Sequence, residues 1–193
     1  ALRHEIATSG HSPGPLGKAF LRLLGERGWL GVGWPREYGG QGRSMIEQTI
    51  FYHELDLQDI HYGNLTITSL AMVLMKLASE EQKRQYLRQI LAGELEICLG
   101  YTEPGAGSDL AAVRARAVPQ GDGSYKLYGQ KIFITYGEHD YTDNIIHLVL
   151  ARIEDAPPGT QGLSLFIVPK IWVNEDGSLG ERNRLECVSI EQK

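Results

Sequence analysis

The sequence has 193 residues, 42% of them hydrophobic, and a formal net charge of −5 from 19 basic and 24 acidic side chains. This length allows one large domain or two small ones, because a domain takes roughly 150 residues. The composition excludes a disordered chain and a collagen-like fibre. Because lysine and arginine do not cluster, we do not expect a nucleic acid as partner.

The cysteine pattern and the apolar runs exclude further classes of protein. Cys98 and Cys187 lie far apart and form no CxxC pair, which argues against a disulfide framework or a zinc site and indicates a reducing compartment. We therefore expect the cytoplasm. The longest apolar run, residues 70–77, contains Lys76 and is far shorter than the ~20 residues of a membrane span. No signal peptide is recognised, and the missing initiator Met suggests a segment of a longer protein.

The first half of the chain has the periodicity of helices. Apolar residues recur at helical spacing between Pro15 and Gly28, which suit the first turn and the end of a helix. Ser44 is placed to cap a second helix. The apolar residues of this second helix approximate one face: Ile46, Ile50, Leu55 and Leu57.

Two more helices are predicted before the pattern changes. Residues 65–77 are apolar, and Ser79 to Gln82 then fit a capping box, in which two side chains satisfy the free backbone amides at a helix start. Gly93 suits the position just after that helix. We therefore expect residues 1–96 to form a helical, bundle-like domain.

After Glu96 the hydrophobic period changes from 3.6 to 2. The predicted strands are residues 113–118, 125–128, 131–135, 145–151 and 163–168. Short strands with frequent turns and no helices between them predict an antiparallel barrel or sandwich over residues 97–193. The expected fold class is therefore α+β, with the domain boundary near Glu96.

The segment richest in chemical information is YTEPGAGSD, residues 101–109, here called the glycine loop. Gly105 and Gly107 permit positive φ angles, which let consecutive backbone amides turn toward one point. Thr102 and Ser108 add hydroxyl groups that donate or accept hydrogen bonds. Such a loop suits an oxyanion or the electron-rich edge of a ring. The alternative is an ordinary glycine turn before a capped helix or strand.

A second candidate is GQKIFITYG, residues 129–137, here called the aromatic segment. In a strand, Lys131, Phe133 and Thr135 share one face and the isoleucines share the other. If the isoleucines fill the core, the ring of Phe133 and the hydroxyl of Thr135 look outward and flank a planar heterocycle. The alternative is a surface aromatic residue that covers a neighbouring strand.

Together, these two segments resemble the flavin-binding motifs of the acyl-CoA dehydrogenase family. The resemblance rests on GYTEPGAGSD at residues 100–109, on the aromatic segment, and on the strand GLSLFIVP at residues 162–169. The helices upstream also fall where the family has them, so the resemblance covers most of the chain. It implies that FAD lies across the middle β-domain.

The resemblance also implies which residues contact the cofactor. The pyrimidine side of the flavin would be lined by Tyr101, Thr102, Gly107 and Ser108. Phe133 and Thr135 would flank the ring and its ribityl chain, and Ser108 would also lie near the pantetheine of the substrate. The resemblance also places Leu99 in the lining of the flavin site, although many relatives have an aromatic residue there. Donors at the N1/C2=O edge stabilise the negative charge that reduction places on the flavin.

The reaction of the family implies an acyl-CoA substrate and electron-transferring flavoprotein as the acceptor. A glutamate of a C-terminal helical domain removes the α-proton while the β-hydrogen leaves as hydride to flavin N5. Nothing in this sequence resembles that domain, so we expect an FAD-dependent acyl-CoA dehydrogenase that lacks its base here, inactive alone and homo-oligomeric at full length. Glu103 and Glu138 are interpreted as structural.

Several alternatives stay open. An acyl-CoA oxidase or a flavin monooxygenase uses the same scaffold, and a non-catalytic acyl-CoA- or flavin-binding module is the alternative from another class. A hydrolase triad of Ser108 and Asp109 with His139 or His147 is disfavoured because no GxSxG motif surrounds the serine. Residues 138–140 are interpreted as a solvated loop and not as a metal site.

Overall fold

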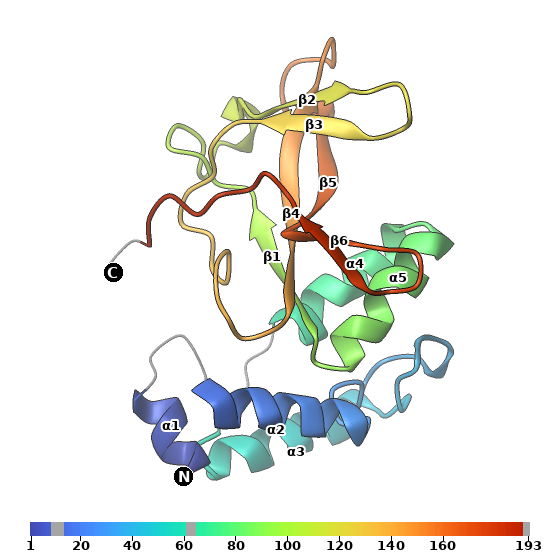
Figure 1. The fold of residues 1–193 in the computed structure, drawn as a ribbon, viewed down its shortest axis with the longest axis vertical. Helices are drawn as coiled ribbons and strands as arrows, with labels where there is room; N and C mark the ends of the chain where they lie inside the picture. Colours follow the sequence, from blue (N-terminus) through green and yellow to red (C-terminus); the bar gives the residue numbers. More distant parts are fainter. Residues whose placement is uncertain (9–13, 61–64, 191–193) are drawn as a thin grey trace.

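The computed structural model describes residues 1–8, 14–60 and 65–190. Helices occupy the first half of the chain and strands the second, and Figure 1 shows α1 to α3 at one end of the molecule and β2 and β3 at the other. The helices are α1 (Leu2–Thr8), α2 (Gly14–Glu26), α3 (Met45–Leu57), α4 (Ala71–Leu77) and α5 (Glu80–Leu91). A π-helical turn, η2 (Thr66–Leu70), leads directly into α4.

Local sequence determines where α3 and α5 begin. Ser44 and Ser79 each accept a hydrogen bond from the backbone N–H three residues later. The side chains of Glu47 and Gln82 accept in return from the backbone N–H of these serines, which completes a capping box at each helix. Gly93 has a φ angle of 72° after α5, the left-handed conformation that glycine adopts without steric cost. The predicted starts and the predicted end are confirmed.

The helical half differs from the sequence prediction at α1 and α3. Helix α1 has no counterpart in the prediction. In α3, Ile46 is 73% exposed and Ile50 56% exposed, so the predicted apolar face does not enter the core. Of that face, Leu55 packs against the core, together with Phe51 and Tyr52, because α3 turns a side rotated from the predicted one toward the other helices.

The main core lies between the helices and strands β1 (Leu95–Gly100) and β4 (Asn144–Ile153). Trp34 is fully buried in it and donates from Nε1 to the carbonyl oxygen of Ile67 at 2.9 Å, which satisfies the polar end of a large apolar side chain. Helices and strands both contribute buried side chains, among them Leu21, Leu74, Leu87, Ile90, Ile97, Ile146 and Leu148.

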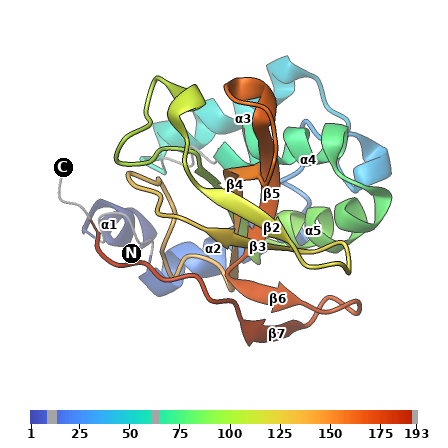
Figure 2. The same cartoon turned by 90° about the horizontal axis from the view of Figure 1, so that it is seen from above.

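The sheet is arranged around β4, its longest strand. The remaining strands are β2 (Arg116–Pro119), β3 (Tyr125–Tyr128), β5 (Leu163–Pro169), β6 (Ile171–Val173) and β7 (Leu179–Arg182). Strand β5 pairs with one edge of β4, so β1 and β2 follow one another along the opposite edge. Seen from above in Figure 2, β2 and β3 lie over the centre, with the β6–β7 hairpin on one side and α3 and α4 on the other.

The α+β fold class is confirmed, with helices followed by a curled sheet, and the sheet is mixed and not wholly antiparallel. Strands β1 and β2 both run parallel to β4. Parallel pairing requires a long connection, and long stretches of chain separate β4 from β1 and from β2. The short connections β2–β3, β4–β5 and β6–β7 join antiparallel pairs. The boundary near Glu96 stays a prediction, and β1 runs across it.

Two of the predicted strands differ in the structure. The strand expected at residues 113–118 begins only at Arg116. The strand expected at residues 131–135 is wrong, because Phe133 has a φ angle of 57° and Tyr136 one of 59°. A left-handed backbone at these residues is incompatible with an extended strand.

This topology excludes the glycine loop from the sheet. Strand β1 ends with Gly100 opposite Val149, and β2 starts with Arg116 opposite Arg152, on the same edge of β4. The chain between them leaves the edge and returns to it a few residues further along. The glycine loop therefore projects from a fixed position beside the central strand (Figure 1).

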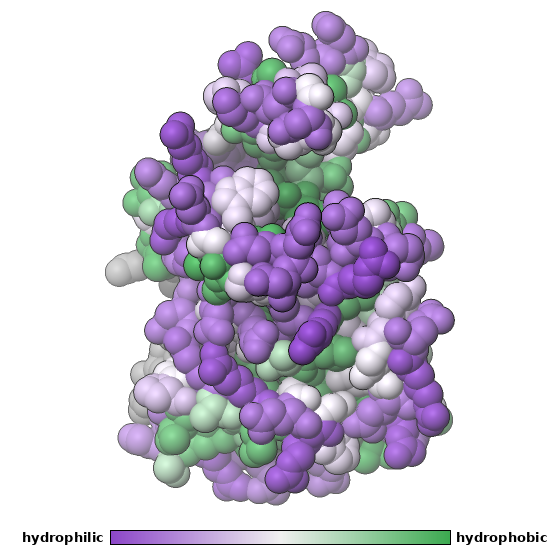
Figure 3. All heavy atoms as spheres, turned by 45° about the vertical axis from the view of Figure 1, so that its right-hand side comes forward, coloured by the Kyte–Doolittle hydropathy of each residue, from purple (hydrophilic) through white to green (hydrophobic). Residues whose placement is uncertain are grey.

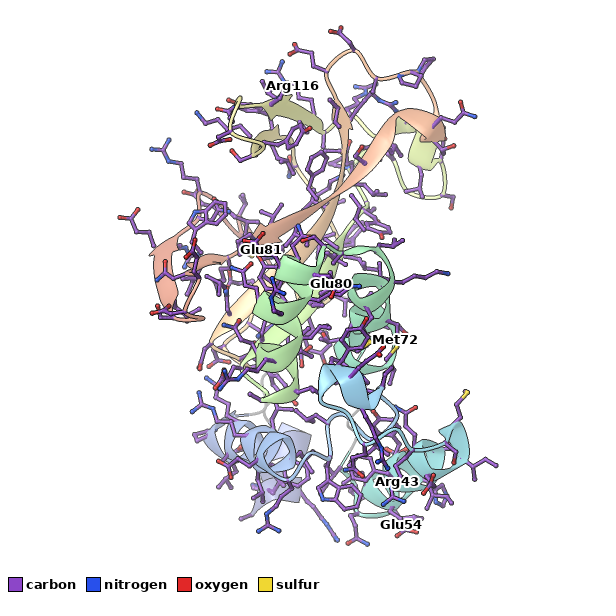
Figure 4. The ribbon with its side chains drawn as sticks, turned by 90° about the vertical axis from the view of Figure 1, so that its right-hand side faces the viewer. Arg43, Glu54, Met72, Glu80, Glu81 and Arg116 are labelled. Atoms are coloured by element: carbon purple, nitrogen blue, oxygen red, sulfur yellow. The ribbon has the colours of Figure 1, made fainter. Side chains whose placement is uncertain are left out.

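The surface carries mixed charges. The face in Figure 3 is largely hydrophilic with apolar patches between the polar residues, and Figure 4 shows Glu80 and Glu81 at the beginning of α5, where carboxylates interact favourably with a helix N-terminus. In the described ranges, no helix has the length and hydropathy to cross a membrane. Within the same ranges, no cluster of three or more His, Cys, Asp or Glu side chains is arranged to hold a metal ion.

Candidate functional site

The glycine loop begins with a tight turn. The backbone N–H of Glu103 donates to the carbonyl oxygen of Ala106 at 2.9 Å, and the N–H of Ala106 donates back at 3.0 Å. Neither Gly105 nor Gly107 has a positive φ angle, so that expectation is wrong. A turn over Pro104 and Gly105 without positive φ is not of type II, the type that demands glycine.

The two glycines instead leave open space above the loop. A Cβ atom added at Gly105 or Gly107 would have no neighbour within 4 Å. At Gly100, where β1 ends, the same atom would lie 3.0 Å from the side chain of Val149. The surface of the glycine loop is therefore accessible, and a ligand can approach its backbone closely.

Glu103 fixes the base of the loop. This residue is 8% exposed. Its carboxylate accepts from the backbone N–H of Arg114 at 2.8 Å, from that of Ala115 at 2.9 Å, and from Lys131 Nζ at 2.8 Å. Burial raises the pKa of Glu103, but Lys131 and the two N–H groups lower it by more, so this pKa lies below its ordinary value of 4.5. The geometry agrees with the structural interpretation of Glu103.

Lys131 joins the aromatic segment to the glycine loop. Besides Glu103, its Nζ contacts the carbonyl oxygen of Tyr101 at 3.1 Å. The neighbouring backbone N–H of Ile132 donates to the carbonyl oxygen of Thr102 at 3.0 Å. The two segments thus lie side by side, to the left of β1 and β4 in Figure 1. Sequence reasoning placed Lys131 outward and missed this contact.

The aromatic segment presents its ring to solvent, as predicted. Phe133 is 63% exposed, and Thr135 is exposed as well. The backbone at Phe133 is left-handed, and the Lys131 side chain is buried while the Phe133 ring is exposed. The predicted directions of Phe133 and Thr135 hold although the predicted strand does not exist.

Several hydrogen-bonding groups on these segments are available. Within the described ranges, no hydrogen bond is found for the hydroxyl groups of Thr102, Ser108 and Thr135, or for the backbone N–H groups of Gly107 and Ser108. Ser108, Gly107 and Thr135 are exposed, and Thr102 is half-buried. These donors can serve a ligand without breaking a bond within the fold.

Two other candidate residues are less accessible. Tyr101 is half-buried, and burial raises the pKa of its hydroxyl group. Leu99 packs against the main core, on the face of β1 that also carries Leu95 and Ile97. The structure therefore brings Thr102, Gly107 and Ser108 to an accessible surface next to the aromatic segment, while Leu99 faces the helices.

The segment after Thr135 holds a histidine that sequence reasoning interpreted as solvated. His139 Nδ1 accepts from the backbone N–H of Tyr141 at 3.0 Å, so the proton of the neutral ring is on Nε2. This Nε2 is buried and has no partner in the described part of the chain. Burial, followed by the charge of Lys170, lowers the pKa of His139 to about 4. The solvated-loop interpretation is wrong here, and Glu138 nearby pairs with Lys170.

The arrangement fits a planar heterocycle with acceptor atoms on one edge. Backbone and hydroxyl donors of Thr102, Gly107 and Ser108 suit such an edge, and fixed donors stabilise negative charge that develops there. The exposed ring of Phe133 offers an apolar face. The flavin of FAD has both features, so the residues present fit the cofactor that the sequence resemblance implies.

Comparison with known proteins gives a family for both halves of the chain. Residues 3–94 match the family model described as "Acyl-CoA dehydrogenase, N-terminal domain". Residues 98–184 match the model described as "Acyl-CoA dehydrogenase, middle domain". The candidate site lies within the second match.

Individual relatives agree with these matches. The chain is 43% identical over 170 residues to 3-methylmercaptopropionyl-CoA dehydrogenase of Ruegeria pomeroyi, covering 87% of this chain and 29% of that protein. It is 43% identical over 166 residues to acyl-CoA dehydrogenase FadE29 of Mycobacterium tuberculosis, covering 86% of this chain and 41% of that protein.

A solved structure described as "Tcur3481-Tcur3483 steroid ACAD" has the same fold. It superposes with a TM-score of 0.74 at 40% sequence identity, over 87% of this chain and 42% of that chain. The chain thus spans less than half the length of these three proteins. On these matches, the chain belongs to the acyl-CoA dehydrogenase family, of which it has the N-terminal and middle domains.

Proposed function

We propose that this chain is the flavin-binding part of an FAD-dependent acyl-CoA dehydrogenase, which introduces an α,β double bond into an acyl-CoA thioester. The observation that carries the proposal is the set of available donors on the glycine loop, which Ile132 and Lys131 join to the aromatic segment with its exposed Phe133. Family membership supports it. Because the chain spans less than half of its relatives, the activity is proposed for the full-length protein.

Each residue of the site has a proposed role. Thr102, Gly107 and Ser108 donate hydrogen bonds to the pyrimidine edge of the flavin, and Phe133 packs against the ring. Thr135 contacts the ring or the ribityl chain, and the resemblance adds Tyr101 and Leu99 to the lining. When bound, FAD supplies the redox chemistry of the reaction. The residues of this chain orient it and provide fixed donors where negative charge develops.

The catalytic base is proposed to lie in the C-terminal helical domain of the full-length protein. Two glutamates near this site are unsuited to that role, because Glu103 is engaged by Lys131 and two backbone amides. Glu138 pairs with Lys170 and Arg182. The chain alone is therefore proposed to be inactive.

Substrate and partners follow from the same assignment. Ser108, exposed at the end of the glycine loop, is proposed to contact the pantetheine of the acyl-CoA as well as the flavin. Electron-transferring flavoprotein is the proposed acceptor, and a homo-oligomer is the proposed state of the full-length protein. The cytoplasmic location stays a prediction.

Purification of the full-length protein tests this function. We expect it to carry about one FAD per chain and to reduce an artificial electron acceptor when an acyl-CoA is added. A colourless protein that takes up no FAD contradicts the proposal. Oxygen consumption that matches turnover with electron-transferring flavoprotein favours the acyl-CoA oxidase alternative. Bound FAD without turnover on any acyl-CoA favours a non-catalytic binding module.

A further inference from the structure

Glu103 and Lys131 form a contact in which three separate pieces of the site meet. Glu103 belongs to the glycine loop, Arg114 and Ala115 lead into β2, and Lys131 belongs to the aromatic segment. The Glu103 and Lys131 side chains are 7% and 13% exposed, and their charged atoms lie 2.8 Å apart. Removal of one partner from a contact this well shielded leaves an uncompensated buried charge, which is costly.

Each member of this pair is next to a residue of the candidate site. Thr102 directly precedes Glu103, and Phe133 follows Lys131 by two residues. A displacement of either charged side chain therefore moves a hydrogen-bond donor or the aromatic ring. Two further hydrogen bonds link the two segments: Lys131 Nζ donates to the carbonyl oxygen of Tyr101, and the Ile132 N–H donates to that of Thr102.

We propose that Glu103 and Lys131 are positioning residues for the flavin, which set the distance and angle between the donors of the glycine loop and the ring of Phe133 without touching the cofactor. This inference rests on the proposed function. Small displacements of a binding group weaken a ligand strongly when its geometry is preorganised. In a regular strand Lys131 and Phe133 would share one face, whereas here the Lys131 side chain is buried against Glu103 and the Phe133 ring is exposed.

The first measurement is the FAD dissociation constant of full-length Lys131→Met, determined from the change in flavin fluorescence on binding. Met keeps most of the side-chain volume but removes the charge and the donors. We expect affinity to fall by about tenfold or more, the scale seen when supporting residues around a bound group are lost. Lys131→Arg, which keeps the charge, should recover part of the affinity. Glu103→Gln should lower the affinity for FAD as well.

A matched control separates positioning from a general loss of stability. Trp34→Phe removes a buried hydrogen bond to Ile67 in the helical part, away from the site. We expect Trp34→Phe to lower the melting temperature of the apoprotein and to leave the FAD dissociation constant unchanged. An equal loss of FAD affinity in Trp34→Phe and in Lys131→Met contradicts a positioning role.

A double-mutant cycle supplies a readout that a merely structural role would not change. Ser108→Ala should lower the affinity for FAD by the same factor in the wild type and in the Trp34→Phe variant. In Lys131→Met, where the loop is displaced, Ser108→Ala should have a clearly smaller effect, because effects of coupled residues are not additive. Full additivity in all backgrounds contradicts the inference.

The outcomes distinguish this inference from the function on which it rests. If the wild type binds no FAD, the proposed function fails. If the wild type binds FAD and Lys131→Met binds it equally tightly, the function stands and the positioning role is wrong. If Lys131→Met does not fold, Lys131→Arg and Glu103→Gln decide by the same titration and the same cycle.

Discussion

Gly107 is a residue at which cofactor binding and folding can be separated. Its φ angle is accessible to other residues, and an added Cβ meets no atom within 4 Å. We expect Gly107→Val to change the free energy of unfolding of the apoprotein by less than about 0.5 kcal/mol, as for other exposed sites. If the open space holds the flavin, the valine side chain occupies it, and FAD affinity falls more than about tenfold. Unchanged affinity would place the flavin elsewhere.

His139 makes stability depend on pH. Its pKa is lowered to about 4 from 6.5 by burial and by Lys170, against the opposing charges of Glu138 and Asp140. Between these values the unfolded chain binds a proton that the folded chain does not, so stability decreases as pH falls from 6.5 to 4. We expect His139→Gln to show a shallower decrease in melting temperature over this range. Some slope should remain, because burial also lowers the pKa of His147. If the melting temperatures of the wild type and of His139→Gln fall in parallel with pH, His139 is not a source of this pH dependence.

At the scale of the element, the start of α5 depends on one side chain. Ser79 accepts from the backbone N–H of Gln82 and completes a capping box. We expect Ser79→Ala to lower the free energy of unfolding by about 1 kcal/mol, whereas Ser79→Asp, which keeps an acceptor, should stay close to the wild type. Urea unfolding measures both. Equal losses in the two variants would show that the cap is not what the serine contributes.

The elements that could be predicted from the sequence are those with local causes. The capping serines Ser44 and Ser79, the glycine after α5, and the apolar runs of β4 and β5 act within a few residues, and their elements are found where expected. The strand predicted for the aromatic segment does not form, and Lys131 of this segment pairs with Glu103, 28 residues earlier in the chain. Alternating residues predict a strand, and nothing in that pattern reveals a distant partner.

The candidate site was predictable in part for the same reason. The exposed directions of Phe133 and Thr135 and the available hydroxyls of Thr102 and Ser108 agree with expectations from residue type and motif. The positive φ angles assumed for the glycine loop do not occur, because the turn over Pro104 does not need them. The burial of His139 depends on tyrosines and a lysine that pack around it in three dimensions.

The directions of the strands depend on the whole molecule. A sequence of short strands suggests successive hairpins, yet β1 and β2 pair with β4 in parallel, across long connections. This pairing places β1 between β4 and the π-helical turn η2, where Thr66 Oγ1 accepts from the backbone N–H of Ile97 at 2.8 Å. The edge of β1 is thereby covered by the helical half of the chain.

The two halves consequently share one core. Leu21 of α2 and Ile90 of α5 belong to the same buried cluster as Ile146 and Leu148 of β4. We expect helices and sheet to unfold in one cooperative transition, so that far-ultraviolet circular dichroism and tryptophan fluorescence give the same midpoint. Two separate midpoints would show that the predicted boundary near Glu96 divides two independently stable domains.

The most direct test of the whole account is a crystal structure of the full-length protein with FAD bound. We predict that the pyrimidine edge of the flavin accepts hydrogen bonds from Thr102, Gly107 or Ser108 and that its ring lies against Phe133. The pair of Glu103 and Lys131 should remain intact beneath it. A flavin bound elsewhere, with the glycine loop facing solvent, would contradict the account.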